Sequence, residues 1–177
     1  MPEPVKESNS DYKNALSQAM EDLAQDPRVV FLGQGVAYPG TFMSTTLENV
    51  PSEKKIELPV AEQMQGGICI GMALAGFVPV CIYPRWNFAL LAADMLVNHL
   101  DKMQPHVIVR VGVGSTTPLD PGPQHKGDMT DAFRLLMPDT TIIRLESADD
   151  IRGEYASALR CNAPTVLVEI ADLYQAS

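Results

Sequence analysis

The chain has 177 residues, 46% of them hydrophobic and 20% charged, which is typical of one globular domain with a sizeable core. Its formal net charge is −9, and this acidity argues against nucleic acid or an anionic membrane as the main partner, because clustered Lys and Arg bind such partners. The longest apolar stretch, around residues 68–82, is interrupted by Gly76 and Pro79 and is too short for a membrane span.

The N-terminal residues and the cysteines indicate the compartment. The first ten residues are polar and lack the apolar core of a signal peptide. The three cysteines, Cys69, Cys81 and Cys161, each lie in an apolar setting, which indicates reduced core residues. We therefore expect a cytoplasmic protein.

Apolar periodicity predicts helices and strands that alternate along the chain. The expected helices cover 11–24, 60–74, 88–103, 131–137 and 148–160, and the expected strands cover 29–32, 55–57, 78–83, 107–111, 140–145 and 165–170. In the helix at 88–103, we expect Leu91, Met95 and Leu96 to face inward. The alternation favours an α/β three-layer sandwich with a mostly parallel central sheet, as one domain over 11–177 after a loose tail at 1–10.

The helix expected at 60–74 has an unusual composition. It is almost without charge, so it should be buried on most of its faces. Its first turn nevertheless carries Glu62. Gly67, Gly71 and Ala75 follow at intervals of four, which puts them on one side, where another backbone can approach closely. The stretch predicts a buried acid beside a tight packing seam.

Three segments should meet at one edge of the sheet. In open α/β sheets, ligands gather at the carboxyl ends of the strands. Glycine-rich loops begin after Leu32 and after Val111, and Glu62 lies close to another strand end. This arrangement predicts a ligand site at that edge, although loops on an inert domain would have the same placement.

Several runs in this order and spacing resemble one known family. The run from Pro59 to Gln63 is followed by Gly67-x-x-x-Gly71, and later by Gly122 to His125 and Pro164 to Glu169. Together they are similar to the pyrimidine-binding domain of thiamine diphosphate enzymes, as in the beta subunits of 2-oxo-acid dehydrogenases and in transketolases. The resemblance covers roughly residues 28–170.

The resemblance implies roles for three residues. Glu62 would hydrogen-bond a pyrimidine nitrogen of thiamine diphosphate and so promote proton loss from the thiazolium carbon; otherwise it would be an acid favoured by the helix dipole. Phe88 would stack on the pyrimidine, or else it is a core residue. His125 would face the reacting carbon and help with proton transfer or substrate binding, or else it is a solvated loop histidine.

For other residues the sequence indicates less specific roles. The resemblance implies self-association of the chain through the helix face of Gly67 and Gly71, with a tight contact inside the chain as the alternative. Arg85 and Trp86 could shape a substrate pocket or an interface, and the sequence does not choose. His99 and His106 appear in structural settings, and the three scattered histidines show no metal-ligand spacing.

One half of the family's active site has no counterpart in this sequence. Relatives hold the diphosphate through Mg²⁺ with Gly-Asp-Gly and, later, paired Asn, and Gly127-Asp128-Met129 is not that motif. The resemblance therefore implies that a separate subunit holds most of the Mg²⁺ and diphosphate contacts. The relatives' third, carboxy-terminal domain has no counterpart before Ser177, which favours a compact α2β2 heterotetramer over a lipoyl-type complex.

These features predict the pyrimidine-binding subunit of a two-chain thiamine diphosphate enzyme acting on a small carbonyl substrate. We expect a transketolase-like transferase first and 2-oxo-acid decarboxylation second. The few candidates for binding a sugar phosphate are Arg85, His125 and Lys126. The main alternative is a non-catalytic scaffold or regulatory homologue. A plain nucleotide-binding module is a weaker alternative, because no phosphate-binding Gly motif opens a helix after the first strand.

Overall fold

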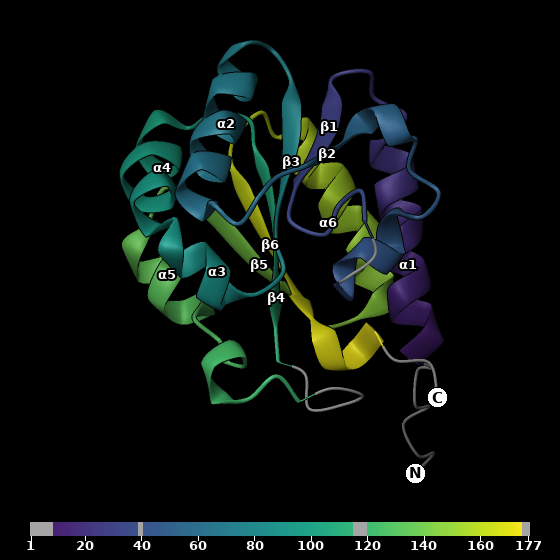
Figure 1. The fold of residues 1–177 in the computed structure, drawn as a ribbon. Coiled ribbons are helices and arrows are strands. Elements are labelled where there is room, and N and C mark those ends of the chain that lie inside the picture. The colour runs from purple at the N-terminus through teal and green to yellow at the C-terminus, as the bar shows by residue number, and fades with distance from the viewer. Residues whose placement is uncertain (1–8, 39–40, 115–119, 175–177) are drawn as a thin grey trace.

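A parallel sheet forms the centre of the molecule (Figure 1). The computed structural model describes residues 9–38, 41–114 and 120–174. Within these ranges the sheet has six strands in the order β2-β1-β3-β4-β6-β5, and every pairing is parallel. The strands are β1 (Val29–Gly33), β2 (Lys55–Glu57), β3 (Val78–Tyr83), β4 (Ile108–Val113), β5 (Thr141–Leu145) and β6 (Thr165–Ile170).

Helices cover both faces of the sheet, which confirms the predicted three-layer α/β sandwich. In Figure 1, helices lie to the right and to the left of the sheet. Those on the right are α1 (Asn9–Leu23) and α6 (Ala148–Arg160); those on the left are α2 (Glu62–Leu74), α3 (Trp86–Leu91), α4 (Asp101–Met103) and α5 (Thr130–Leu136). Two apolar cores result, and successive residues such as Phe31 and Leu32 in β1 enter opposite cores.

The predicted helix at 88–103 is wrong as a single α-helix. It begins earlier, at Trp86, and consists of α3, a π-helical turn at Met95–Leu100 and α4. The wider π turn shifts the direction of the side chains relative to a regular α-helix. Leu96 is buried as expected. Leu91, which precedes the π turn, is 64% exposed and does not face inward, because Ala89 and Ala92 take the inward positions.

The start of the first helix and the loop after β1 also differ from what the sequence indicates. Helix α1 begins at Asn9, inside the predicted tail, and residues 1–8 lie outside the described ranges. The long loop after β1 contains a 3-10 turn, η1 (Met43–Leu47). Met43 and Leu47 are buried in the core under α1, so this part of the loop is packed.

Helix α2 is buried on one side only. Cys69 and Ile70 enter the core, whereas Gly67, Gly71 and Leu74 are exposed, so the expected burial on most faces is wrong for this chain. No atom within the described part of the chain lies within 4 Å of a Cβ built at Gly71. The alternative of a tight contact inside the chain at Gly67 and Gly71 is therefore not what the structure has.

The closely packed glycine of α2 is Gly66, which directly precedes Gly67. A Cβ at Gly66 would lie 2.8 Å from the Cβ of Met95 and 3.3 Å from the hydroxyl of Tyr83. Both atoms belong to well-packed elements, since Tyr83 is buried at the end of β3 and Met95 opens the π turn. The small residue at position 66 is thus what lets α2 approach the helical segment after α3.

A buried ion pair joins β4 to β6. The carboxylate of Glu169 accepts hydrogen bonds from Arg110 Nε at 2.7 Å and Nη2 at 2.9 Å, and both side chains are fully buried. The hydroxyls of Tyr155 and Tyr174 also donate to Glu169, and Thr46 Oγ1 accepts from Arg110 Nη2 at 3.0 Å. Burial opposes the charge of Arg110, but the Glu169 carboxylate outweighs it and raises the pKa of Arg110.

Breaking this pair on one side should be costly. Arg110→Met should lower the free energy of unfolding by about 3–5 kcal/mol, because Glu169 would be left buried without its counter-charge. Adding Glu169→Gln removes the orphaned charge and keeps an acceptor for the tyrosine hydroxyls, so the double variant should recover part of that loss. Urea denaturation measures both, and equal losses in the two variants would contradict this account.

Gly66→Ala should destabilise the chain more than an alanine at an open helical glycine. Gly153 in α6 is the matched control, because nothing lies within 4 Å of a Cβ built there. Both substitutions replace glycine by alanine inside a helix, so both gain the same helix propensity. Overpacking against Met95 should therefore leave Gly66→Ala about 1–3 kcal/mol less stable than Gly153→Ala. Denaturant titration of both variants gives this difference, and no difference would mean that α2 moves freely.

Candidate functional site

Glu62 is the first residue of α2, and its side chain is only 5% exposed. The side-chain amide of Gln34 donates to Glu62 Oε1 at 3.0 Å. Gln34 directly follows β1, and the hydroxyl of Tyr83, at the end of β3, donates to the backbone carbonyl of Glu62 at 3.2 Å. Two neighbouring strand ends therefore fix the position of this acid.

A second carboxylate fixes the loop that carries Gln34. Glu57 accepts backbone N–H groups of Gly35, Val36 and Ala37 at 2.6, 2.7 and 2.8 Å. Burial by itself raises the pKa of Glu57, but these N–H groups outweigh burial and lower it. The charged form of Glu57 thus holds the start of the loop against β2.

Phe88 and His125 are in contact. Their rings stack with centroids 5.6 Å apart and an interplanar angle of 15°. Phe88 lies half-buried on α3, and His125 ends the short 3-10 turn η4 (Pro123–His125). His125 Nδ1 is buried and has no hydrogen-bond partner among the described residues.

The carboxyl edge of the sheet is its lower edge in Figure 1, and the contacts of the three predicted site residues place them near it. Glu62 is bonded to Tyr83, and the helix that carries Phe88 begins three residues after Tyr83. His125 reaches the same place from the loop that follows β4. The structure thus brings together residues from three separate parts of the sequence.

These side chains could hold one side of a flat, nitrogen-containing ring. Glu62 supplies a buried carboxylate with one oxygen already held by Gln34, and Phe88 supplies an aromatic surface. Two buried polar atoms beside Phe88, His125 Nδ1 and Asn87 Oδ1, lack partners within the described ranges. Both atoms are therefore available for hydrogen bonds to a group outside the described residues.

The structure answers the questions about Trp86 and the basic residues. Trp86 is buried, donates to Thr130 Oγ1 at 3.1 Å and stacks on Phe133 with centroids 4.5 Å apart, so it packs the interior. Arg85 Nη1 donates to backbone carbonyls, including that of His125 at 3.1 Å. Lys126 forms an ion pair with Asp120 at 2.8 Å. Both candidate phosphate-binding cations are therefore already engaged.

The remaining titratable residues lie elsewhere. His106 Nε2 is 3.0 Å from the carbonyl oxygen of Ala158, as expected of a structural histidine. Cys69 and Cys81 are buried as expected, but Cys161 is exposed at the end of α6, so its assignment to the core is wrong. Among the residues that the structure describes, no group of three or more His, Cys, Asp or Glu could hold a metal ion.

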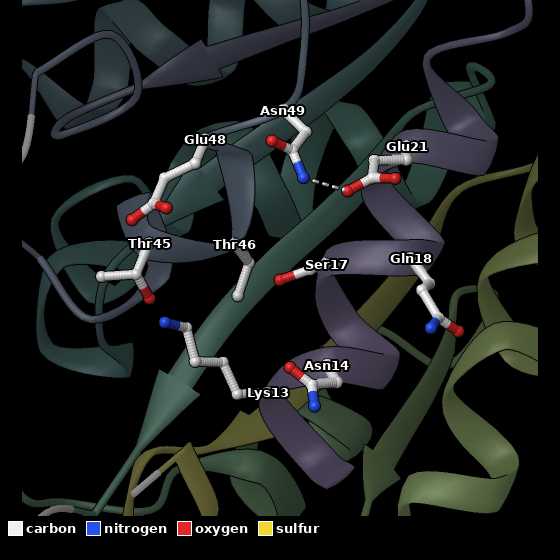
Figure 2. Close-up of a pocket in the computed structure, with 9 residues that line it drawn as sticks. All are labelled: Lys13, Asn14, Ser17, Gln18, Glu21, Thr45, Thr46, Glu48 and Asn49. Atoms are coloured by element: carbon white, nitrogen blue, oxygen red, sulfur yellow. Dashed lines mark hydrogen bonds between the residues drawn. The ribbon is translucent and has the colours of Figure 1, made fainter. Parts of the chain in front are cut away.

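A polar hollow of about 390 Å³ lies away from this cluster, between α1 and η1 (Figure 2). The side chain of Lys13 points toward Thr45 and Glu48, and Asn49 donates to Glu21 at 2.7 Å across the upper part of the view. The lining residues belong to α1 and to η1 with the residues after it. None of the three predicted site residues contributes to it.

Sequence reasoning missed four residues that support the site or the core. Arg110 and Glu169 each place one charge inside an otherwise apolar strand, and that pattern was a usable signal for a buried pair. Glu57 and Gln34 gave no comparable signal, because their roles depend on where the loop after β1 folds back.

The comparisons with known proteins identify the family. A family model described as "Transketolase, pyrimidine binding domain" matches residues 8–176. The chain belongs to the transketolase pyrimidine-binding domain family. It is 31% identical over 176 residues to the mitochondrial pyruvate dehydrogenase E1 component subunit beta of Chaetomium thermophilum, and 30% identical over 173 residues to the human subunit of the same name.

The matches cover this chain almost fully and the relatives by about half. They include 93% and 92% of this chain, but 46% and 48% of the fungal and human subunits. A solved structure described as a split gene transketolase, inactive beta4 tetramer, has a TM-score of 0.74 and 18% identity, over 90% of this chain and 51% of that one. This likeness shows the same fold.

Two further findings bear on the compartment. In the ranges that the structure describes, no helix has both the length and the apolar character needed to cross a membrane. The names of the relatives place those proteins in mitochondria, and a cytoplasmic location for this chain remains a prediction.

The loop held by Glu57 should loosen in acid. Because the folded-state pKa of Glu57 is depressed, its stabilisation is present above the ordinary value of 4.5 and is lost as the pH falls below that value. Glu57→Gln should therefore lower the free energy of unfolding by on the order of 1.5 kcal/mol at pH 7, and by less at pH 3. Denaturation of both proteins across this range tests the sign, and a deficit that grows in acid would contradict it.

Proposed function

We propose that this chain is the pyrimidine-binding subunit of a two-chain thiamine diphosphate-dependent enzyme. The observation that carries the proposal is the buried carboxylate of Glu62, held by Gln34 at the edge where Phe88 and His125 meet. Membership of the family supports the cofactor, because the matched domain is named for pyrimidine binding.

Each of the three residues has a distinct task in this proposal. Glu62 holds a pyrimidine ring nitrogen with the carboxylate oxygen that Gln34 leaves available, at a position from which most water is excluded. Phe88 orients the ring through its aromatic face. His125 exchanges a proton with the substrate through its unpaired Nδ1. When bound, thiamine diphosphate supplies the carbon nucleophile for the bond change next to a carbonyl.

The substrate class that we now favour is a 2-oxo acid, ahead of ketol transfer, which reverses the order expected from the sequence. A sugar phosphate needs cations for its phosphate group, and both Arg85 and Lys126 are already bonded within the chain. The most similar curated relatives reported above are pyruvate dehydrogenase subunits, which agrees with this order. Ketoses remain the second class to test.

The partner in this proposal is a diphosphate-binding subunit, with an α2β2 heterotetramer as the assembly. We place Mg²⁺ mainly with that subunit, because the sequence has no Gly-Asp-Gly followed by paired Asn. The exposed face of α2 with Gly67 and Gly71 is the surface that we assign to contact between two copies of this chain. Backbones can approach closely where side chains are this small.

Glu62→Gln should abolish cofactor activation while leaving assembly intact. In the complex with the diphosphate-binding subunit, deuterium exchange of the thiazolium proton, followed by NMR, should slow by at least about 100-fold. Glu53→Gln, at an exposed position in the short 3-10 turn before β2, is the matched control and should exchange like the wild type.

The same experiment tests the rival interpretation. If a verified complex of the two subunits binds no thiamine diphosphate with Mg²⁺, the catalytic proposal is wrong and the chain is a scaffold or regulatory homologue. If the wild-type complex exchanges the proton, assays with 2-oxo acids and ketoses then identify the substrate class.

A further inference from the structure

Arg85 connects two loops at the carboxyl edge of the sheet. It lies in the turn between β3 and α3, and its Nη1 donates to the carbonyl oxygens of Gly114 and His125, the latter at 3.1 Å. Gly114 directly follows β4, and its positive φ of 76° marks the start of the loop that returns at η4. One guanidinium nitrogen therefore joins the beginning of this loop to the turn that carries His125.

The guanidinium is itself held in place from the core. It lies over the ring of Phe42, 5.5 Å from the centroid, and Phe42 packs edge-on against Tyr174 with centroids 4.8 Å apart. Tyr174 donates to Glu169, the partner of Arg110. The position of Arg85 is therefore fixed by contacts that lead to the buried ion pair.

Phe42 is pressed closely against β4. A Cβ at Gly112 would lie 2.5 Å from Phe42 Cζ, so only glycine fits there without movement of the ring. The ring of Phe42 under the Arg85 guanidinium consequently has little room to shift.

The ring and the backbone of His125 are held by different contacts. Its Nδ1 has no hydrogen-bond partner within the described ranges, and its ring stacks on Phe88. Its backbone is held by a hydrogen bond from its own N–H to Gly122 at 3.1 Å and by the bond that its carbonyl oxygen accepts from Arg85. Because Nδ1 makes no hydrogen bond among the described residues, the position of the ring depends on its stacking against Phe88 and on the backbone contacts of the turn.

We propose that Arg85 is a positioning residue, which holds the backbone of the His125 turn and so places the histidine ring against Phe88. This inference rests on the proposed function for its catalytic consequence, but its structural part concerns the chain alone. Arg85 acts on the reaction through His125 and not through contact with a substrate phosphate. A guanidinium suits this task because its planar fork donates in fixed directions.

The first test is amide hydrogen exchange of the full chain. Arg85→Met should speed exchange in residues 120–129 and leave the sheet unchanged, while Arg85→Lys, which keeps the charge without the fork, should give an intermediate rate. Arg160→Met, at an exposed end of α6, is the matched control and should behave as the wild type. Unchanged exchange in both Arg85 variants would overturn the proposal.

The second test uses the complex with the diphosphate-binding subunit. Arg85→Met should lower kcat by about 10- to 100-fold, since misplacing a reacting group has effects of that size. The double variant with His125→Ala should be no slower than His125→Ala alone, because the two residues act as one unit. Added guanidinium should restore part of the activity of Arg85→Met. Effects of the two substitutions that multiply would contradict the proposal.

The two proposals fail in different ways. Exchange of the thiazolium proton depends on Glu62 and should persist in Arg85→Met. If it is missing from the wild-type complex, the proposed function fails, and the hydrogen-exchange test of the His125 turn still decides the role of Arg85.

Discussion

Arg110 and Glu169 form an ion pair inside the sheet, where both side chains are fully buried. A charge can remain in such a place only with a counter-charge and hydrogen bonds around it. The bonds come from α6, from η1 and from the turn η5 (Ala171–Tyr174), so the pair gathers elements from both ends of the sequence. The ion pair therefore ties these three segments to the sheet within the layer that contains α1 and α6.

Aromatic contacts connect the same pair to the candidate site. Tyr174 donates a hydrogen bond to Glu169 and packs against Phe42, and the guanidinium of Arg85 lies over the ring of Phe42. From Arg85 the contacts continue to the turn of His125. The candidate site is therefore built mainly by backbone and loop contacts that a rigid sheet holds in place, which is how α/β sheets usually present functional groups.

The fold could be predicted from the sequence because each buried strand is an apolar run and each main helix has its apolar residues at regular spacing. Glu62, Phe88 and His125 were found through a resemblance, and topology alone would have placed Glu62 and the two loops at one edge. The inward position expected for Leu91 is wrong because the small residues Ala89 and Ala92 form the buried face of α3, and large apolar residues alone did not indicate that face. Cys161 was misplaced because its neighbours are apolar while its position at a helix end is exposed. Gln34 and Glu57 meet their partners only after the chain folds back, so local patterns could not identify them.

The exposed Cys161 has a practical consequence. Cys69 and Cys81 are buried, so a thiol-reactive dye or spin label should attach at one position of the native chain. Cys161 precedes β6, and the six residues of that strand separate it from the opposite edge by about 20 Å. A label there would tether the protein to a surface without touching Glu62, Phe88 or His125.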